Sequence, residues 1–144
     1  MARLPIAVVM QRRTVRHRWT DIVWRAVGVV ANPLGLSAAS TIDASDDEAS
    51  FLVPGIDLSL YPDENDGYFE NWAAPEPKVF VMWRLDGERA WPVIASVSYG
   101  EGTRMLDSGE CADGVPMPPD IHAWLGAYLQ EHYRPAPRRG RQHG

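Results

Sequence analysis

The most regular pattern of apolar and polar positions lies near the C-terminal end of the chain. Between residues 118 and 133, apolar side chains recur at i, i+3, i+4, i+7 and i+8, the spacing of one face of an α-helix. The residues on this face are Ile121, Trp124, Leu125, Tyr128 and Leu129. Proline suits the first helical turn, and an acidic residue there suits the positive end of the helix dipole. The pattern therefore predicts a helix that begins at Pro118 or Pro119 and buries its apolar face against a sheet.

Most of the preceding sequence has the patterns of β-strands. Residues 4–12 are apolar and β-branched, which predicts a first strand. Residues 19–31 are apolar almost without interruption, and they predict a central strand that is covered on both faces. Residues 51–61 alternate apolar and polar side chains, which is typical of a strand with one buried face.

Turn residues divide the middle of the chain into two predicted hairpins. Asp86-Gly87 lies between the apolar segments 78–85 and 91–99, and an Asp-Gly pair in this position is a strong hairpin signal. Residues 62–67 have the composition of a turn, because Asn, Asp and Gly tolerate left-handed conformations. Residues 68–72 then predict a short strand that pairs with the strand before the turn.

Two segments have no clear apolar period. Residues 37–48 contain small and acidic side chains, so we expect a mobile loop there. Residues 100–108 could form a short helical turn, although Gly100 and Gly102 each cost about 1 kcal/mol relative to alanine in a helix interior.

Together these elements predict an α+β fold that is mainly β. About six antiparallel strands would form a small barrel or a twisted sheet, packed by one C-terminal amphipathic helix. A length of 144 residues suits a single globular domain. We assign residues 1–133 to this domain. Residues 134–144 hold four arginines and no large apolar side chain, which predicts a disordered basic tail.

Charge is unevenly distributed along the chain. Residues 43–120 hold seventeen acidic residues against four basic ones, whereas both ends are basic. We interpret this as charge complementarity within the molecule, because a nucleic-acid-binding domain is usually basic as a whole. No apolar run approaches the length of about 18 residues that a membrane helix needs. With a single cysteine, Cys111, and no signal-peptide pattern, the expected location is the cytoplasm.

Candidate metal and thiol chemistry is weak. The acidic turn at 63–67 differs from a calcium-binding EF-hand loop, because its glycine comes one place early and position 12 is Ala74. Asp107, Glu110, Cys111 and Asp113 could hold a metal or an activated thiol, but neither a nearby histidine nor a paired cysteine accompanies them. We therefore expect an inert Cys111 and neither a metal nor a cofactor.

Two functional hypotheses remain. The first is a non-enzymatic accessory or binding module. The alternative is a small enzyme or cofactor-handling protein that uses His122, His132 or Cys111 with nearby carboxylates. The two histidines lie at the edges of the helical stripe without a nucleophile motif, and such histidines are more often structural. The six tryptophans favour a packed core over a ligand groove. The first hypothesis is therefore the stronger one.

Several motifs are similar to those of a known family. The most specific are Asp107-Ser108-Gly109-Glu110 and Val115-Pro116-Met117-Pro118. The other matching positions are Trp19, Trp24, Arg25, Tyr68, Asn71, Val81, Arg84, Tyr99, Trp124, His132 and the basic tail. Over nearly the whole chain, the sequence resembles the proteobacterial domain-of-unknown-function family 3305, whose genes often lie beside those of molybdenum-containing formate dehydrogenases. It differs at 98–102, where the family has a Pro-Tyr-Glu-Ala helix start, and in its scattered tail arginines.

The resemblance implies an accessory role in the assembly or regulation of a molybdenum-dependent formate dehydrogenase. The implied partner is the dehydrogenase or one of its maturation factors, and neither a membrane nor a nucleic acid is expected. Some members are labelled molybdopterin-guanine dinucleotide biosynthesis proteins, but such enzymes need an N-terminal glycine-rich phosphate loop, and residues 4–18 contain no glycine. The candidate partner-binding residues are Trp24, Arg25, Asp107, Glu110, Arg138 and Arg139.

Overall fold

The computed structural model describes residues 2–16, 20–33 and 35–134. The strands in these ranges are β1 (Ala2–Arg16), β2 (Thr20–Ala31), β3 (Ser40–Ala44), β4 (Glu48–Leu60), β5 (Lys78–Asp86), β6 (Arg89–Ser96) and β7 (Cys111–Pro116). The helices are the 3-10 turn η1 (Pro62–Glu64), α1 (Asn65–Trp72), α2 (Tyr99–Asp107) and α3 (Pro119–His132). The predicted class, α+β and mainly β, is confirmed.

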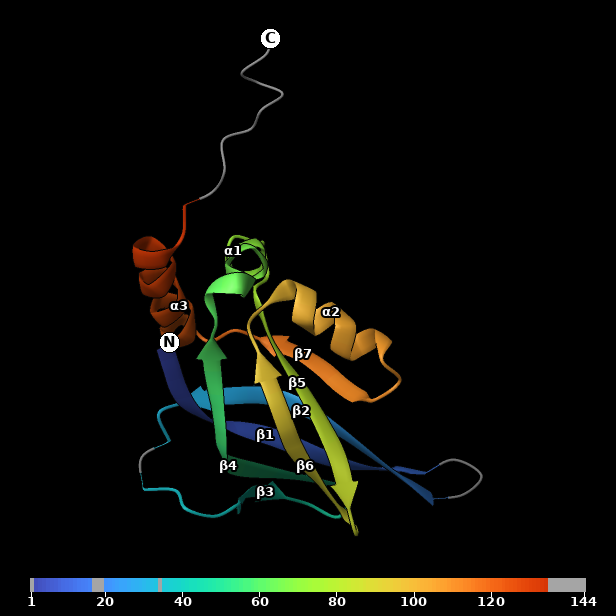
Figure 1. Ribbon diagram of the computed structural model, residues 1–144. Coiled ribbons are helices and arrows are strands. Elements are labelled where there is room, and N and C mark those ends of the chain that lie inside the picture. The colour runs from blue at the N-terminus through green and yellow to red at the C-terminus, as the bar shows by residue number, and fades with distance from the viewer. Residues whose placement is uncertain (1, 17–19, 34, 135–144) are drawn as a thin grey trace.

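The strands form two antiparallel sheets. One has four strands in the order β2-β1-β4-β3, and the other has three in the order β6-β5-β7. The sheets meet along two flanks, where β2 contacts β7 and β4 contacts β6. In the described part of the chain no backbone ladder joins the two sheets, so the strands do not close into a barrel. A shared apolar core fills the space between them, and the three α-helices lie together at one end (Figure 1).

The first strand holds the centre of the larger sheet. Ile6, Ala7, Val8 and Met10 of β1 are fully buried, since β2 and β4 flank this strand on both sides. The prediction that residues 19–31 form a central strand covered on both faces is wrong. β2 is an edge strand of the larger sheet, and the outer face of β2 is uncovered, so Val23 is 44% exposed.

Two other predictions need correction, and one strand was missed. The expected mobile loop at 37–48 contains β3, which pairs with β4 and whose five residues are all exposed. An edge strand exposed on both faces has no reason to show an apolar period. The expected hairpin at 51–72 is absent, because residues 65–72 form α1. β7 was not predicted, since Gly114 and Pro116 interrupt its pattern.

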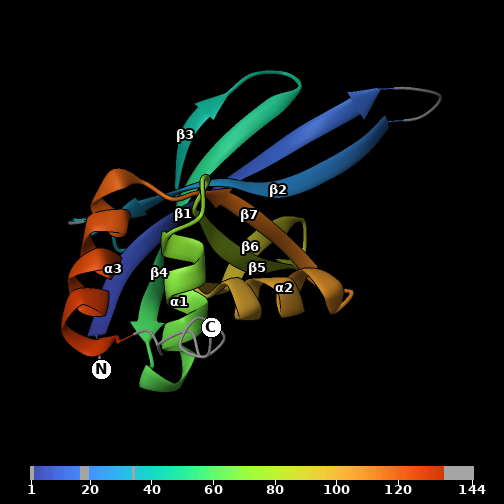
Figure 2. The same cartoon turned by 90° about the horizontal axis from the view of Figure 1, so that it is seen from above.

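Both helices that the sequence predicts are present in the structure. The C-terminal helix is confirmed as α3, which buries Ile121, Leu125, Tyr128 and Leu129, while Trp124 is half-buried at the edge of the core. The helical turn at 100–108 is a nine-residue helix, α2, capped by the Ser98 side chain, which accepts a hydrogen bond from the Glu101 N–H. Seen from above, α1 lies between α3 and α2 (Figure 2). None of the described helices is long and apolar enough to cross a membrane.

Candidate functional site

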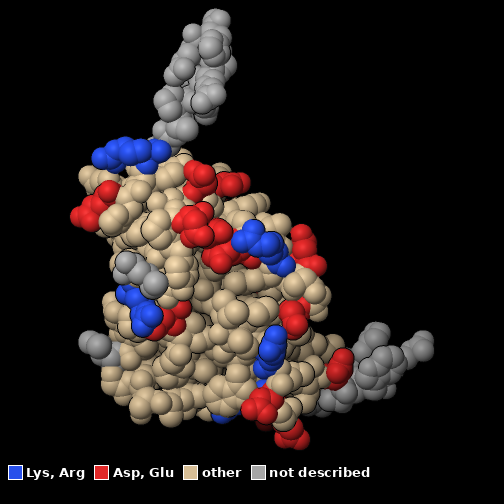
Figure 3. Space-filling model, viewed as in Figure 1, with Lys and Arg blue, Asp and Glu red and all other residues tan. Residues whose placement is uncertain are grey.

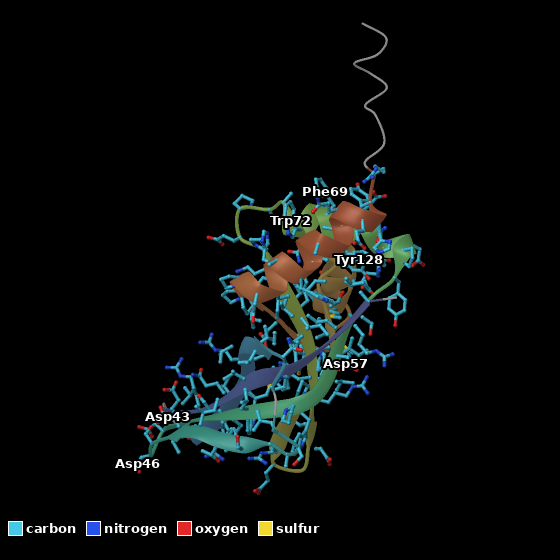
Figure 4. All side chains as sticks on the ribbon, turned by 90° about the vertical axis from the view of Figure 1, so that its left-hand side faces the viewer. Asp43, Asp46, Asp57, Phe69, Trp72 and Tyr128 are labelled. Atoms are coloured by element: carbon cyan, nitrogen blue, oxygen red, sulfur yellow. The ribbon has the colours of Figure 1, made fainter. Side chains whose placement is uncertain are left out.

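A groove lies on the outer surface where α1 meets α3. Its volume is about 450 Å³. It is lined by Phe69, Trp72, His122, Ala123, Gly126, Leu129, Gln130 and Tyr133, and we call it the aromatic groove. Figure 4 looks onto α3 and shows Phe69 and Trp72 together beside it. The groove is therefore built from two helices that lie far apart in the sequence.

His122 and Trp72 join the two helices through three contacts. The imidazole of His122 stacks on the Trp72 indole, with ring centroids 4.8 Å apart and planes 7° from parallel. His122 Nε2 donates a hydrogen bond to the Trp72 carbonyl oxygen at 3.0 Å, and Trp72 Nε1 donates to the His122 carbonyl oxygen at 3.0 Å. Nε2 must carry a proton here, because a carbonyl oxygen only accepts. These contacts give His122 a structural role.

The row of rings continues past Trp72. Phe69 stacks at 6.3 Å from Trp72 and at 5.1 Å from Tyr133, measured between ring centroids. The Tyr133 hydroxyl donates a 2.7 Å hydrogen bond to Asp66 Oδ1. This bond to the carboxylate raises the pKa of Tyr133, since it favours the neutral phenol. His122, Trp72, Phe69 and Tyr133 thus form a continuous stack of rings along the groove.

Buried amide side chains hold the two helices in place. Asn71 is 1% exposed, and its Nδ2 donates to the carbonyl oxygens of Lys78 and Val97, each at 2.8 Å. Its Oδ1 accepts from the Lys78 N–H at 3.0 Å. Asn71 therefore ties α1 to β5 and to the end of β6. Because every polar atom of this amide has a partner, α1 is fixed relative to the sheet.

Asn65 ties α1 directly to α3. Its Nδ2 donates to the His132 carbonyl oxygen at 3.0 Å, and its Oδ1 accepts from the Tyr128 hydroxyl at 2.8 Å. Tyr68 lies below, fully buried, and its hydroxyl accepts from the Tyr61 N–H at 2.9 Å. Burial raises the pKa of Tyr68 to about 12. The groove therefore has a rigid base, which lowers the entropy cost of binding a partner.

A glycine makes room for the indole. A Cβ at Gly126 would lie 3.0 Å from Trp72 Nε1 and 3.2 Å from Cε2, which is tighter than ordinary packing. The ring of Trp72 consequently rests directly on the backbone of α3. A larger residue at position 126 would push the indole outward and narrow the groove.

The exposed charges around the groove are mainly acidic, although Arg134 donates to the carbonyl oxygens of Gln130 and Tyr133 at one end. Asp66 and Glu70 on α1 and Glu131 near the end of α3 are exposed. Figure 3 shows acidic side chains gathered over the helical end of the molecule, with few basic ones between them. A segment that fills the apolar groove would therefore be favoured if basic residues flank it.

The residues of the alternative enzyme hypothesis do not converge. His122 lines the groove near the start of α3, whereas His132 lies ten positions later, roughly 15 Å away at the rise of an α-helix. The His132 ring packs against Tyr128 and lies 3.7 Å from Glu131. Cys111 is exposed at the start of β7, where it pairs with Trp83 of β5. These three side chains therefore do not share a site.

The acidic group around Cys111 is dispersed in the same way. Asp113 Oδ2 accepts hydrogen bonds from Trp83 Nε1 at 2.8 Å and from the Ala26 N–H at 2.9 Å, so it joins the two sheets. Glu110 forms an exposed ion pair with Arg84 at 3.6 Å. Among the described residues, no three His, Cys, Asp or Glu side chains gather as a metal site would require.

The structure also separates the candidate partner-binding residues. Trp24 is buried on the inner face of β2, while Arg25 is exposed on the outer face, as alternation along a strand requires. Asp107 and Glu110 lie near the end of α2, exposed. Arg138 and Arg139 lie outside the described residues. Their proposed role stays a prediction.

Sequence reasoning missed most of the aromatic groove. Phe69 and Trp72 fell in the segment read as a short strand, so their rings were not placed beside α3. A usable signal was present, because Tyr68, Asn71 and Trp72 have the i, i+3, i+4 spacing of a helix face. The sequence pattern places Tyr133 at the end of the predicted helix and gives its ring no partner.

A family model described as "Protein of unknown function (DUF3305)" matches residues 5–142, which is nearly the whole chain. No curated protein and no solved structure gives a significant match.

Proposed function

Because the chain belongs to the DUF3305 family of proteins of unknown function, we propose its function from its own geometry, as a non-enzymatic module that binds a partner protein through the aromatic groove. The observation that carries this proposal is the stack of four partly exposed rings on a rigid base. Aromatic side chains are enriched at protein interfaces because they bury a large area at a small entropy cost. A groove between two helices suits an apolar segment of a partner.

The charges around the groove define the partner segment further. Asp66, Glu70 and Glu131 are exposed near its edges, so the segment would carry basic residues on either side of its apolar part. The apolar contacts would supply most of the affinity, and the charges would speed association and select the partner.

The identity of the partner rests on the sequence resemblance alone. On that basis the partner is a molybdenum-dependent formate dehydrogenase or one of its maturation factors, and the module acts in assembly or regulation in the cytoplasm. The residues that the sequence marks for partner binding, Asp107 and Glu110 near α2 among them, would add a second, weaker contact. Exposed charges of this kind mainly affect the association rate.

Two alanines on α3 allow a controlled test of the groove. Ala123 lines the groove, while Ala127 is exposed one helical turn later and does not line it. Ala123→Arg would fill the groove, and Ala127→Arg makes the same chemical change on the same helix. Neither substitution removes a core contact, so both variants should fold.

The experiment is co-purification of the tagged chain with the molybdenum-dependent formate dehydrogenase of its own host, both expressed together. We expect the wild-type chain and Ala127→Arg to retain the dehydrogenase and Ala123→Arg to lose it. Failure of the wild-type chain to retain the dehydrogenase would overturn the partner assignment. Equal retention by both variants would overturn the role of the groove.

A further inference from the structure

A second hollow lies on the opposite end of the larger sheet from the helices. Its volume is about 400 Å³, and it is lined by Arg12, Trp24, Thr41, Ala44, Ala49, Phe51, Glu88 and Arg89. We call it the arginine groove. Its floor follows the strand register, because Trp24, Arg12, Ala49 and Ala44 are neighbours across β2, β1, β4 and β3. The small alanines on the β4 and β3 side leave the space open above the sheet.

Two guanidinium groups rest on the same ring in this groove. Arg89 Cζ lies 4.4 Å from the Phe51 ring centroid, and Arg12 Cζ lies 5.8 Å from it. Arg89 also lies 5.3 Å from the Trp91 ring centroid. Stacking on an aromatic ring uses the flat face of a guanidinium and leaves its N–H edge free to donate. Both guanidinium groups also line the same hollow, so their N–H edges can donate to one bound group.

These two arginines differ from most others in the described part of the chain. Arg3, Arg13, Arg84 and Arg104 each have a carboxylate within 4.0 Å, at distances of 3.6 to 3.7 Å. Neither Arg12 nor Arg89 forms an ion pair with any described residue, although both are partly buried. A carboxylate bound in the hollow that both arginines line would accept charge-assisted hydrogen bonds from them, beside the exposed Glu88 on the same lining.

The groove also offers an apolar neighbour to such a carboxylate. It shares Arg12, Trp24 and Glu88 with a neighbouring hollow of about 290 Å³, which is also lined by Ile22 and Leu85. These side chains are 55% and 60% exposed, which is high for large apolar residues. Ligands that match both parts carry a carboxylate next to an apolar side chain.

We propose that the arginine groove binds an acidic segment of a partner protein, with a glutamate or aspartate carboxylate held by Arg12 and Arg89 and an adjacent apolar side chain against Ile22 and Leu85. This site is independent of the aromatic groove, which is acidic at its edges and lies at the helical end. The two grooves therefore select segments of opposite charge.

The test is an NMR titration of the full chain that follows the Nε–H signals of Arg12 and Arg89. The probe is a short acetylated and amidated peptide with two glutamates around a leucine, and its comparison is the same peptide with glutamines. We expect saturable shifts with the glutamate peptide only. Arg12→Gln and Arg89→Gln should each weaken binding by about tenfold or more, because a charge-assisted hydrogen-bond donor is lost.

Arg3→Gln is the matched control, since Arg3 lies on the same strand as Arg12 but is paired with Asp57. It should bind the glutamate peptide as the wild-type chain does. The proposal is overturned if the glutamate peptide does not bind, if the glutamine peptide binds equally, or if Arg3→Gln is as impaired as the groove variants. Tighter binding of inorganic phosphate or of a phosphoserine peptide would also overturn it, because the groove would then select phosphate.

Discussion

Gly102 of α2 lies flat against the ring of Phe80 of β5, so that a Cβ at position 102 would fall inside the contact distance of three ring atoms. The glycine that weakens α2 by helix propensity is therefore required by packing. We predict that Gly102→Ala destabilises the protein, even though alanine favours a helix by about 1 kcal/mol. Urea unfolding measures the change.

Gly100 provides the comparison on the same helix. A Cβ there would lie 3.6 Å from its nearest neighbour, Arg104 Nη1, which is an ordinary contact. Gly100→Ala should therefore be neutral or stabilising by up to about 1 kcal/mol. Equal effects of the two substitutions would show that packing against Phe80 does not decide the result.

A second prediction concerns the amide that anchors α1. Asn71→Asp replaces two buried hydrogen-bond donors with acceptors and faces a carboxylate toward the carbonyl oxygens of Lys78 and Val97. We expect a loss of roughly 3 kcal/mol or more in the free energy of unfolding. Asn65→Asp should cost less, because Asn65 donates only one such bond. Denaturant unfolding measures the free energy of unfolding of both variants. A larger loss for Asn65→Asp than for Asn71→Asp would contradict this explanation.

The third prediction is an alkaline loss of stability through Tyr68. The raised pKa, about 12, means that the folded state holds the phenol proton more tightly than the unfolded state, whose pKa is about 10. The contribution of the protonated Tyr68 phenol to the free energy of unfolding is complete below about pH 10. It is lost as the pH rises from about 10 to about 12, at about 1.4 kcal/mol per pH unit. Tyr68→Phe lacks this dependence.

The comparison of Tyr68→Phe with the wild-type chain tests this sign. Near neutral pH the variant should be less stable by roughly 1 to 2 kcal/mol, because the Tyr61 N–H loses its acceptor. The difference in unfolding free energy between the two proteins should narrow as the pH rises above about 10. If this difference stays constant above about pH 10, burial of the Tyr68 phenol does not cause an alkaline loss of stability.

A fourth prediction concerns the link between the two sheets. Asp113→Ala leaves Trp83 Nε1 and the Ala26 N–H without their acceptor, and we expect a loss of about 2 to 4 kcal/mol in unfolding free energy. Asp113→Asn keeps an acceptor oxygen and should cost less. The indole N–H signal of Trp83 should move in the NMR spectrum of Asp113→Ala. An unchanged Trp83 signal would show that this hydrogen bond does not form in solution.

The elements that the sequence predicts correctly are those whose own residues carry a clear pattern of apolar and turn positions. α3 carries its own apolar stripe, and the β5–β6 hairpin carries Asp86-Gly87 between two apolar runs, so both were found. The sequence does not predict α1, because this helix is short and its three aromatic residues, Tyr68, Phe69 and Trp72, suit a strand equally well. Its helical state depends on partners of Asn71 that lie elsewhere in the chain.

The same reasoning explains the two candidate sites. Trp24 was marked from the sequence and does line the arginine groove, but Arg12 and Arg89 were not marked, because their proximity depends on strand pairing. His122 was considered for proton chemistry, and its ring contacts with Trp72 could not be known without α1. The sequence can indicate single candidate residues, whereas the residues that contact them in space can be identified only from the fold.

The two walls of the aromatic groove come from segments fifty residues apart, joined by reciprocal hydrogen bonds between Trp72 and His122. During synthesis α1 leaves the ribosome well before α3, so a growing chain cannot present the groove until α3 has emerged. A partner that binds this surface would therefore recognise only chains whose synthesis and folding have reached α3.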